Sequence, residues 1–136
     1  MKKFPTVILP VILLLTLGLA GCTSEDPSPS PADPRTAFVG TWLANETETK
    51  ATFEVTIELD GSSSTRVRLN NFANSGTPAT AEVSGTNITL IPDQIIGDGW
   101  VLNGSGALTT STKINWAYSF SDGATLHNVT GVYTKQ

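Results

Sequence analysis

The chain contains one cysteine and one histidine among its 136 residues. A single cysteine cannot form an intramolecular disulfide, and one histidine with one cysteine cannot supply the three or four ligands of a zinc site. Nucleophilic triads need a base and a residue that orients it, and His127 is the only histidine available. The sequence therefore predicts no metal centre, no cofactor and no enzymatic activity.

Carboxylates offer two weaker possibilities. Asp93 and Asp98 flank a glycine-containing loop and could present oxygens to calcium, although loop aspartates more often serve turn geometry. Glu46 and Glu48 share the face of an expected strand, but a glycosidase pair needs one of its acids in a dry pocket. Neither pattern changes the expectation that the protein is not an enzyme.

Basic residues are also scarce, with eight lysines and arginines against twelve acidic residues. Lys2 and Lys3 lie at the N-terminus, outside the expected folded domain, so the rest of the chain is more acidic than the total suggests. Nucleic-acid binding depends on clustered lysine and arginine that neutralise phosphates. This composition excludes nucleic acid as an expected partner, and it also disfavours electrostatic attachment to anionic lipid.

Helical periodicity is missing, because no ten-residue stretch carries a convincing apolar stripe. Strict alternation is present instead. Residues 52–60 read TFEVTIELD, and residues 114–120 alternate Ile114, Trp116, Tyr118 and Phe120 with smaller or polar residues. A period of two is typical of half-buried strands. The less regular segment 125–133 suggests a bulge or a residue that is buried on both faces.

About eight short strands are expected from Gly40 onward, separated by turn signals such as Asp60-Gly61 and Ser121-Asp122-Gly123. Strands at this spacing favour an up-and-down meander, and closure would remove exposed sheet edges. The expected fold class is all-β: a single antiparallel up-and-down barrel of about eight strands. A β-sandwich is the alternative.

The N-terminus carries Lys2 and Lys3, an almost uninterrupted apolar stretch over residues 7–19, and then Leu19-Ala20-Gly21-Cys22. This order of regions is typical of a signal peptide. It resembles the bacterial lipoprotein signal with its lipobox, which implies a signal peptide over residues 1–21, cleavage before Cys22 and a diacylglycerol and acyl modification there. A membrane-spanning anchor is the alternative, but the apolar stretch is short and interrupted by prolines.

Residues 22–37 are expected to form the lipidated cysteine and a Pro/Ser-rich tether, since they offer almost nothing apolar to bury. Thr23 stands where an aspartate would favour retention in the inner membrane. Ser24-Glu25-Asp26 resembles the acidic stretch of surface lipoproteins of Bacteroidetes. These resemblances imply lipid anchoring in the outer membrane, and they leave the periplasmic and external faces open.

Residues 38–136 are expected to form the folded domain. Phe38-Val39-Gly40-Thr41-Trp42 resembles the Gly-x-Trp start of lipocalin-type barrels, and the closing Gly131-Val132-Tyr133-Thr134 adds to a similarity with the small lipocalin-like lipoproteins of Bacteroidetes. The resemblance implies a barrel in which Trp42 packs across a closed end. It implies a cellular location more than an activity.

Two functions follow as hypotheses. The first is a non-catalytic binding module for a small apolar or glycan ligand, with Trp100, Asp93 and Asp98 as candidate binding residues at the mouth of the barrel. The second is a structural or interaction lipoprotein whose barrel is filled by side chains and docks an envelope protein partner. Alternation places Trp42 and Trp116 in the core and leaves Trp100 at a rim.

Overall fold

The computed structural model describes residues 32–48 and 52–136; the expected signal peptide, Cys22 and most of the tether lie outside the described residues. This part of the chain forms strands joined by short connections and two 3₁₀ helices. The elements in order are η1 (Pro34–Ala37), β1 (Gly40–Glu46), β2 (Thr52–Leu59), β3 (Arg66–Asn70), η2 (Phe72–Asn74), β4 (Ala79–Ser84), β5 (Asn87–Leu90), β6 (Gln94–Ile96), β7 (Trp100–Thr110), β8 (Lys113–Ser121) and β9 (Leu126–Lys135).

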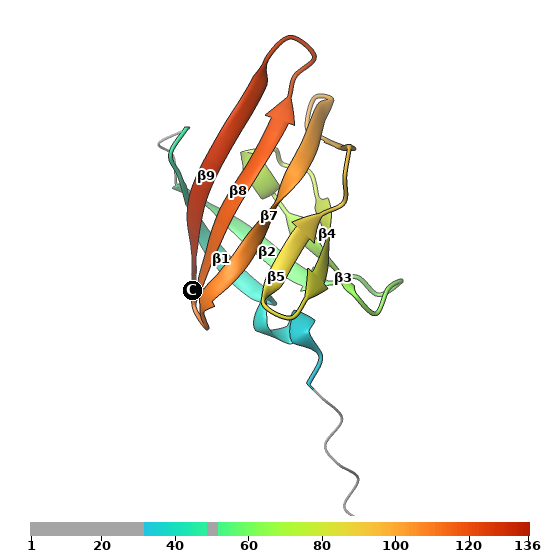
Figure 1. Ribbon diagram of the computed structural model, residues 1–136, viewed down its shortest axis with the longest axis vertical. Helices are drawn as coiled ribbons and strands as arrows, with labels where there is room; N and C mark the ends of the chain where they lie inside the picture. Colours follow the sequence, from blue (N-terminus) through green and yellow to red (C-terminus); the bar gives the residue numbers. More distant parts are fainter. Residues whose placement is uncertain (1–31, 49–51) are drawn as a thin grey trace, which may run out of the picture. The chain divides into compact units, whose positions relative to one another are not determined.

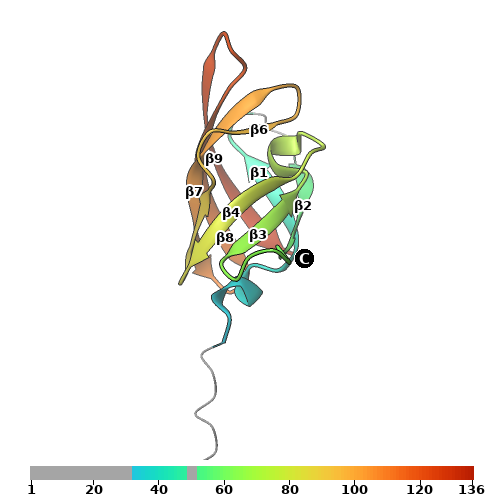
Figure 2. The ribbon, with the colours of Figure 1, turned by 90° about the vertical axis from the view of Figure 1, so that its right-hand side faces the viewer.

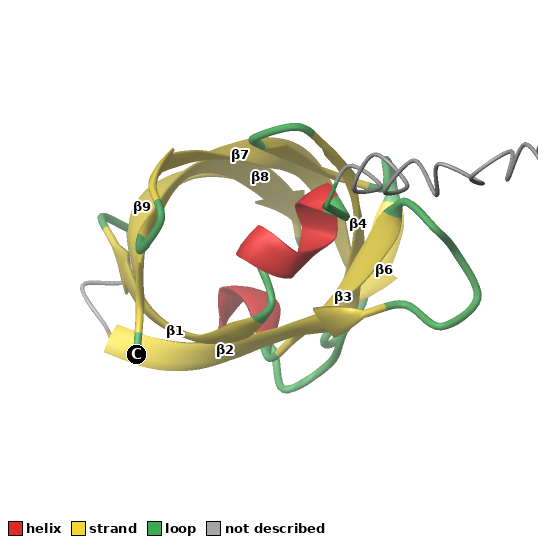
Figure 3. Ribbon diagram, turned by 90° about the horizontal axis from the view of Figure 1, so that it is seen from below, coloured by secondary structure: helices red, strands yellow, loops and turns green. Residues whose placement is uncertain are grey.

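The strands form a closed antiparallel barrel (Figure 1). Neighbours along the chain pair from β1 to β5 and from β6 to β9, while β9 returns to β1 and β5 pairs with β7. Eight strands thus complete the ring, and β6 is an additional strand paired with the start of β7. Seen along the barrel, both 3₁₀ helices lie within the outline of the ring of strands (Figure 3). The predicted up-and-down barrel is confirmed, and the β-sandwich alternative is wrong.

Alternating side chains fill the interior as the period of two predicts. Phe53, Val55 and Ile57 of β2 are buried, whereas Glu54 and Glu58 on the opposite face are exposed. In β9, Val129 and Tyr133 point inward and Leu126 and Val132 point outward. The β8–β9 register is regular, so the bulge suggested for this segment is wrong. A register shift occurs between β7 and β8 instead, near Leu108.

Large rings from β8 are accommodated by glycines on β7. Gly106 is paired with Trp116, and a Cβ there would lie 2.8 Å from the indole ring. Gly104 is paired with Tyr118 and has a φ of +146°, and its Cβ would lie 2.4 Å from the Tyr118 Cα. A side chain at Gly104 would therefore force the two strands apart. Small and large residues alternate across the wall, which lets the rings lie over the neighbouring strand.

The end of the barrel where β1 begins is covered by η1. Phe38 and Trp42 are fully buried there, and Trp42 Nε1 donates to the Phe38 carbonyl at 2.7 Å. Trp42 thus packs across this end, as the Gly-x-Trp resemblance implies. Lys135 at the end of β9 lies over the Trp42 ring, 5.4 Å from its centroid.

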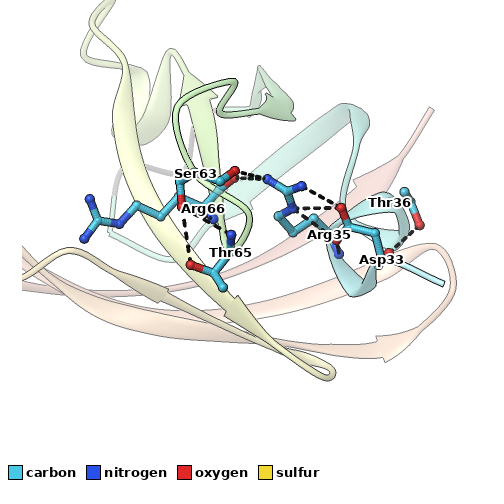
Figure 4. A network of polar contacts seen from close by, with 6 residues as sticks. All are labelled: Asp33, Arg35, Thr36, Ser63, Thr65 and Arg66. Atoms are coloured by element: carbon cyan, nitrogen blue, oxygen red, sulfur yellow. Dashed lines mark hydrogen bonds and ion pairs between the residues drawn. The ribbon is translucent and has the colours of Figure 1, made fainter. Parts of the chain in front are cut away.

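Arg35 fastens η1 to the β2–β3 connection (Figure 4). Its guanidinium donates to the carbonyls of Ser63 and Arg66 at 2.6 and 3.1 Å, and it pairs with the Asp33 carboxylate at 2.6 Å. Hydrogen bonds from the Arg35 side chain and backbone lower the pKa of Asp33. The folded part therefore begins several residues before Phe38, inside the segment that the sequence assigns to the tether.

The opposite end is filled by η2. Phe72 is fully buried and Ala73 nearly so. Asn71, Ala73 and Asn74 all have positive φ values, of 64°, 55° and 53°. This region is sparsely populated by residues other than glycine, and alanine lacks the polar side chain that helps asparagine adopt it. Burial of the Phe72 ring offsets this local strain and turns a surface connection into part of the core.

Candidate functional site

At the η2 end, the wall formed by β7, β8 and β9 extends beyond β1. The β1–β9 pairing stops at Gly131, whereas β9 itself begins at Leu126. The tips of these strands rise above the rest of the barrel in both side views (Figures 1 and 2). Side chains on the inner face of this extension form the rim of the barrel. β1 ends before it reaches this level, so it does not pair with β9 beside the rim.

Three rings are stacked on the inner face of this rim. Phe120 lies between Trp100, at a centroid distance of 4.7 Å, and His127, at 4.6 Å. The interplanar angles are 24° and 15°, so the rings are nearly parallel. Phe120 and His127 are cross-strand partners in β8 and β9, and Trp100 opens β7. All three are half-buried. We call this set the aromatic rim.

Asp122 in the β8–β9 turn orients His127. Its Oδ2 lies 3.3 Å from His127 Nε2, and its Oδ1 accepts from the backbone N–H groups of Ala124 and Thr125 at 2.9 and 2.8 Å. The backbone hydrogen bonds and the imidazole lower the pKa of Asp122. His127 is thus hydrogen-bonded and stacked, and its ring serves as the third member of the aromatic rim.

Of the two aspartates predicted to accompany Trp100, Asp93 is bonded to another residue. Asp93 has a φ of +57°, its backbone N–H donates to Asn103 Oδ1 and its carboxylate accepts from Asn103 Nδ2, both at 3.0 Å. Asn103 is on the outer face of β7, because Leu102 beside it points into the core. Asp98 is exposed in the β6–β7 turn. The described residues contain no group of three His, Cys, Asp or Glu side chains placed to hold a metal ion.

Gln94 joins β6 to β4 by imitating a peptide group. Its side-chain carbonyl accepts from the Thr80 N–H and its amide donates to the Thr80 carbonyl, both at 2.7 Å. The same amide also donates to the Ile91 carbonyl at 3.0 Å. These bonds fix the loop over residues 91–99 against the wall, which positions Trp100 at the end of that loop.

The carboxyl group of Glu46 is enclosed deeper in the barrel than the aromatic rim. Glu46, at the end of β1, is 1% exposed, and its Oε1 accepts from the hydroxyls of Tyr118 and Tyr133, each at 2.8 Å. Burial raises the pKa of Glu46, while the two hydrogen bonds oppose that shift. Burial and the nearby carboxylate raise the pKa of both tyrosines. Within the described residues, Glu46 Oε2 and Trp116 Nε1 are buried without a hydrogen-bond partner.

Sequence reasoning missed this cluster, although a signal was present. Glu46 follows Trp42 and Ala44 at intervals of two, so alternation within β1 places it inside. Glu48, its suggested partner, lies beyond the end of β1 and is exposed. The hydroxyl partners could not be identified because they come from β8 and β9, more than seventy residues along the chain.

Two shallow depressions lie over the outer face of the wall. One spans β7, β8 and β9 around Asn103, Ala117 and Asn128, and the other spans β1, β8 and β9 around Asn45, Asn115 and Val132. Small polar side chains such as Thr130 line both surfaces together with apolar groups. They hold no cluster of charged or aromatic groups that would select a ligand.

No family model matches this sequence, and no curated protein matches it. Two designed proteins of known structure have similar folds. One is a fluorescence-activating beta barrel designed de novo, 17% identical, with a TM-score of 0.50 over 76% of this chain and 98% of that chain. The other is a redesigned beta barrel, 18% identical, with a TM-score of 0.51 over 79% of this chain and 98% of that chain. The likeness concerns the fold alone.

The described part of the chain has no helix of the length and hydrophobicity needed to cross a bilayer.

Proposed function

We propose that this protein is a lipid-anchored, non-catalytic binding module that captures a small ligand at the aromatic rim. The carrying observation is the stack of Trp100, Phe120 and His127, which is half-buried on the inner face of the rim. Aromatic rings of this kind recognise apolar rings and the apolar faces of sugars through dispersion and burial. The fitting ligand class is therefore a small molecule with a flat apolar face, either aromatic or glycan.

The filled interior supports shallow rather than deep binding. Phe72, Tyr133 and Trp42 are fully buried, and 3₁₀ helices cover both ends of the barrel. A ligand of this class would cover the rim and leave the core intact.

The proposed location in the outer membrane rests on the sequence alone. The lipobox Leu19-Ala20-Gly21-Cys22 supports lipidation of Cys22 and anchoring in the outer membrane on either face. Metabolic labelling with a palmitate analogue tests it: the wild-type chain takes up the label and Cys22→Ser does not. Equal labelling of the two chains would refute lipidation at this cysteine.

Native mass spectrometry of the full chain, purified from cells that express it, tests binding at the rim. A co-purified small molecule is expected on the wild type and is lost in Trp100→Ala. Val101→Ala is the matched control. Val101 is the next residue of β7 and its side chain lies on the outer face, so this variant should keep the ligand. Retention of the ligand by the Trp100 variant would exclude the aromatic rim.

An interaction lipoprotein that docks an envelope protein is the second candidate. It is favoured by a cross-strand row on the outer face of the same tips, where Ile95 pairs with Val101, Val101 with Ser121 and Ser121 with Leu126. Ile95 and Leu126 are 70% and 61% exposed. In a cross-linking experiment in cells, a partner lost in Ile95→Ser and Leu126→Ser but kept in Trp100→Ala would favour docking over ligand capture.

A further inference from the structure

Phe72 occupies a cage of aromatic rings that belong to the barrel wall. Its ring centroid lies 5.0 Å from Trp116, 4.8 Å from Tyr118 and 6.1 Å from Tyr133. Trp116 and Tyr118 come from β8 and Tyr133 from β9, and Trp116 also contacts Tyr133 at 5.7 Å. Phe72 itself comes from η2, in the connection between β3 and β4. The ring is therefore inserted into the cage by a connecting segment.

The carboxyl group of Glu46 lies beside this cage, at the hydroxyl ends of its two tyrosines. The hydroxyls of Tyr118 and Tyr133 both donate to Glu46 Oε1, and the buried Oε2 has no hydrogen-bond partner among the described residues. The basic side chains that the structure describes lie elsewhere: Arg35, Arg66, Lys113 and Lys135 at the η1 end and Arg68 on the outer face of β3. No described cation balances this buried acid, and the chain as a whole is acidic.

The occupant of the cage is held there against local backbone preference. Asn71, Ala73 and Asn74 surround Phe72 with positive φ values, and the strained alanine has no side-chain hydrogen bond to compensate. Such conformations persist only where the surroundings impose them, and they concentrate at ligand clamps and switch segments. A strand residue is tied to the barrel by ladder hydrogen bonds, whereas η2 is a three-residue turn. Of the four rings, Phe72 is thus the one that lies outside the strand ladders, in a turn held by hydrogen bonds of Asn71 to the Glu54 carbonyl and the Gly76 N–H.

We propose that the space filled by Phe72 is a binding site for an organic ammonium ion, with Phe72 as its resident plug. One tryptophan and two tyrosines line this space with centroid distances of 5.0, 4.8 and 6.1 Å to the Phe72 ring, about the range over which aromatic rings attract a quaternary or alkylated ammonium through cation–π interactions. Glu46, when ionised, supplies a negative charge that favours an ammonium ion over a neutral apolar guest. This site is separate from the aromatic rim and does not depend on the rim function.

Isothermal titration of the full-length protein with choline tests the proposal, with 3,3-dimethylbutan-1-ol as the probe of the same shape and no charge. Phe72→Ala empties the cage. We expect it to bind choline at least about tenfold more tightly than the wild type, in which Phe72 competes, and to prefer choline to the neutral probe. In the double variant that also carries Glu46→Gln, the affinity for choline should fall about tenfold, so that the preference is lost. The affinity for the neutral probe should not change. Leu126→Ala, on the outer face, is the control and should bind as the wild type does.

Equal affinity of Phe72→Ala for choline and its neutral isostere would mean that the site is only an apolar cavity, and would overturn the proposal. Failure of the folded variant to bind choline would do the same. Phe72→Leu, which leaves a smaller space, carries the comparison if Phe72→Ala does not fold. The wild-type urea midpoint in about 0.1 M choline against the neutral probe provides a third comparison, because a ligand stabilises the state that binds it. A rise with choline alone supports the site, and equal midpoints contradict it.

Discussion

Glu46 is the residue whose surroundings differ most from those that its type prefers. A carboxyl group is rarely buried unless a partner compensates for lost hydration. Here two tyrosine hydroxyls bind one oxygen, and the other has no partner among the described residues. The residue lies on the inner face of β1, in phase with Trp42. Its placement destabilises the barrel whenever the carboxyl is ionised.

The pH dependence of stability should reveal this. Burial raises the folded-state pKa of Glu46 above its ordinary value of 4.5, so the native protein keeps a proton that the unfolded chain has already released. Below the ordinary pKa both states are protonated and Glu46 carries no penalty; as pH rises toward the raised pKa, stability is lost. Glu46→Gln cannot ionise, and its amide oxygen still accepts from both tyrosines. The variant should therefore gain stability relative to wild type as the pH rises above the ordinary pKa of 4.5.

Urea midpoints of both proteins at several pH values measure this difference. The aspartates whose pKa values are lowered, Asp33, Asp60 and Asp122, act in both proteins and cancel in the comparison. A difference that is constant with pH would show that Glu46 titrates in the native state as it does when unfolded.

Trp116 and Trp100 make a second residue-scale comparison. Trp116 is 2% exposed and packs against Phe72 and Tyr133, so Trp116→Ala should cost about 3 to 5 kcal/mol. Trp100 is half-buried and stacks on one ring, so Trp100→Ala should cost much less. Urea unfolding of the two variants checks this, and equal losses would place Trp100 in the core.

At the scale of elements, the two 3₁₀ helices turn an open barrel into a filled one. η1 is four residues long and cannot be stable by itself, since isolated short helices are marginal even at several turns. Arg35 holds it by bonds to two carbonyls of the β2–β3 connection. η2 is held by the burial of Phe72 and by hydrogen bonds of Asn71 to the Glu54 carbonyl and the Gly76 N–H. One end is therefore fastened by an arginine network and the other by an inserted ring together with an asparagine.

Arg35→Ala should loosen the first of these ends. It removes the guanidinium bonds to the Ser63 and Arg66 carbonyls and to the Asp33 carboxylate, so η1 should separate from the barrel and expose the Trp42 end. Faster amide exchange over residues 34–42 and a lower urea midpoint are expected. Arg68→Ala removes an exposed arginine from β3 and serves as the control. Identical exchange in the two variants would mean that η1 does not depend on Arg35.

For the whole molecule, closure is the dominant feature. One contiguous hydrophobic cluster includes residues from both ends, from Phe38 and Trp42 to Phe72 and Ile96. Closure pairs β1 with β9 and β5 with β7, so no large part of the wall can separate without breaking ladder hydrogen bonds. Such a structure is expected to lose its packing and its strands together.

Urea unfolding followed by tryptophan fluorescence and by far-ultraviolet circular dichroism should therefore give coincident transitions. The three tryptophans lie at different levels: Trp42 at the η1 end, Trp116 in the core and Trp100 at the rim. A fluorescence transition that precedes the dichroism change would show that one end of the barrel unfolds independently.

The sequence alone predicted the strands and their inward faces, because period-two alternation is a local property of the chain, and it favoured an antiparallel barrel over a β-sandwich without deciding closure. It also placed Trp42 and Trp116 in the core and Trp100 at the edge, from the same alternation and from the glycines beside Trp100. The lipid anchor at Cys22 stays a prediction from the N-terminal motif. What alternation cannot specify is which residues of distant strands face one another.

The folded barrel set the remaining features. It placed Glu46 beside tyrosines more than seventy residues away, stacked Trp100 on Phe120 and His127, and separated Asp93 from Trp100 by turning it toward Asn103 on the outer face. It inserted Phe72 into the core from a segment whose Asn-rich sequence reads as a turn. The physical reason is that register and closure depend on long-range pairing, so the contacts that form a site are fixed only when the whole barrel closes.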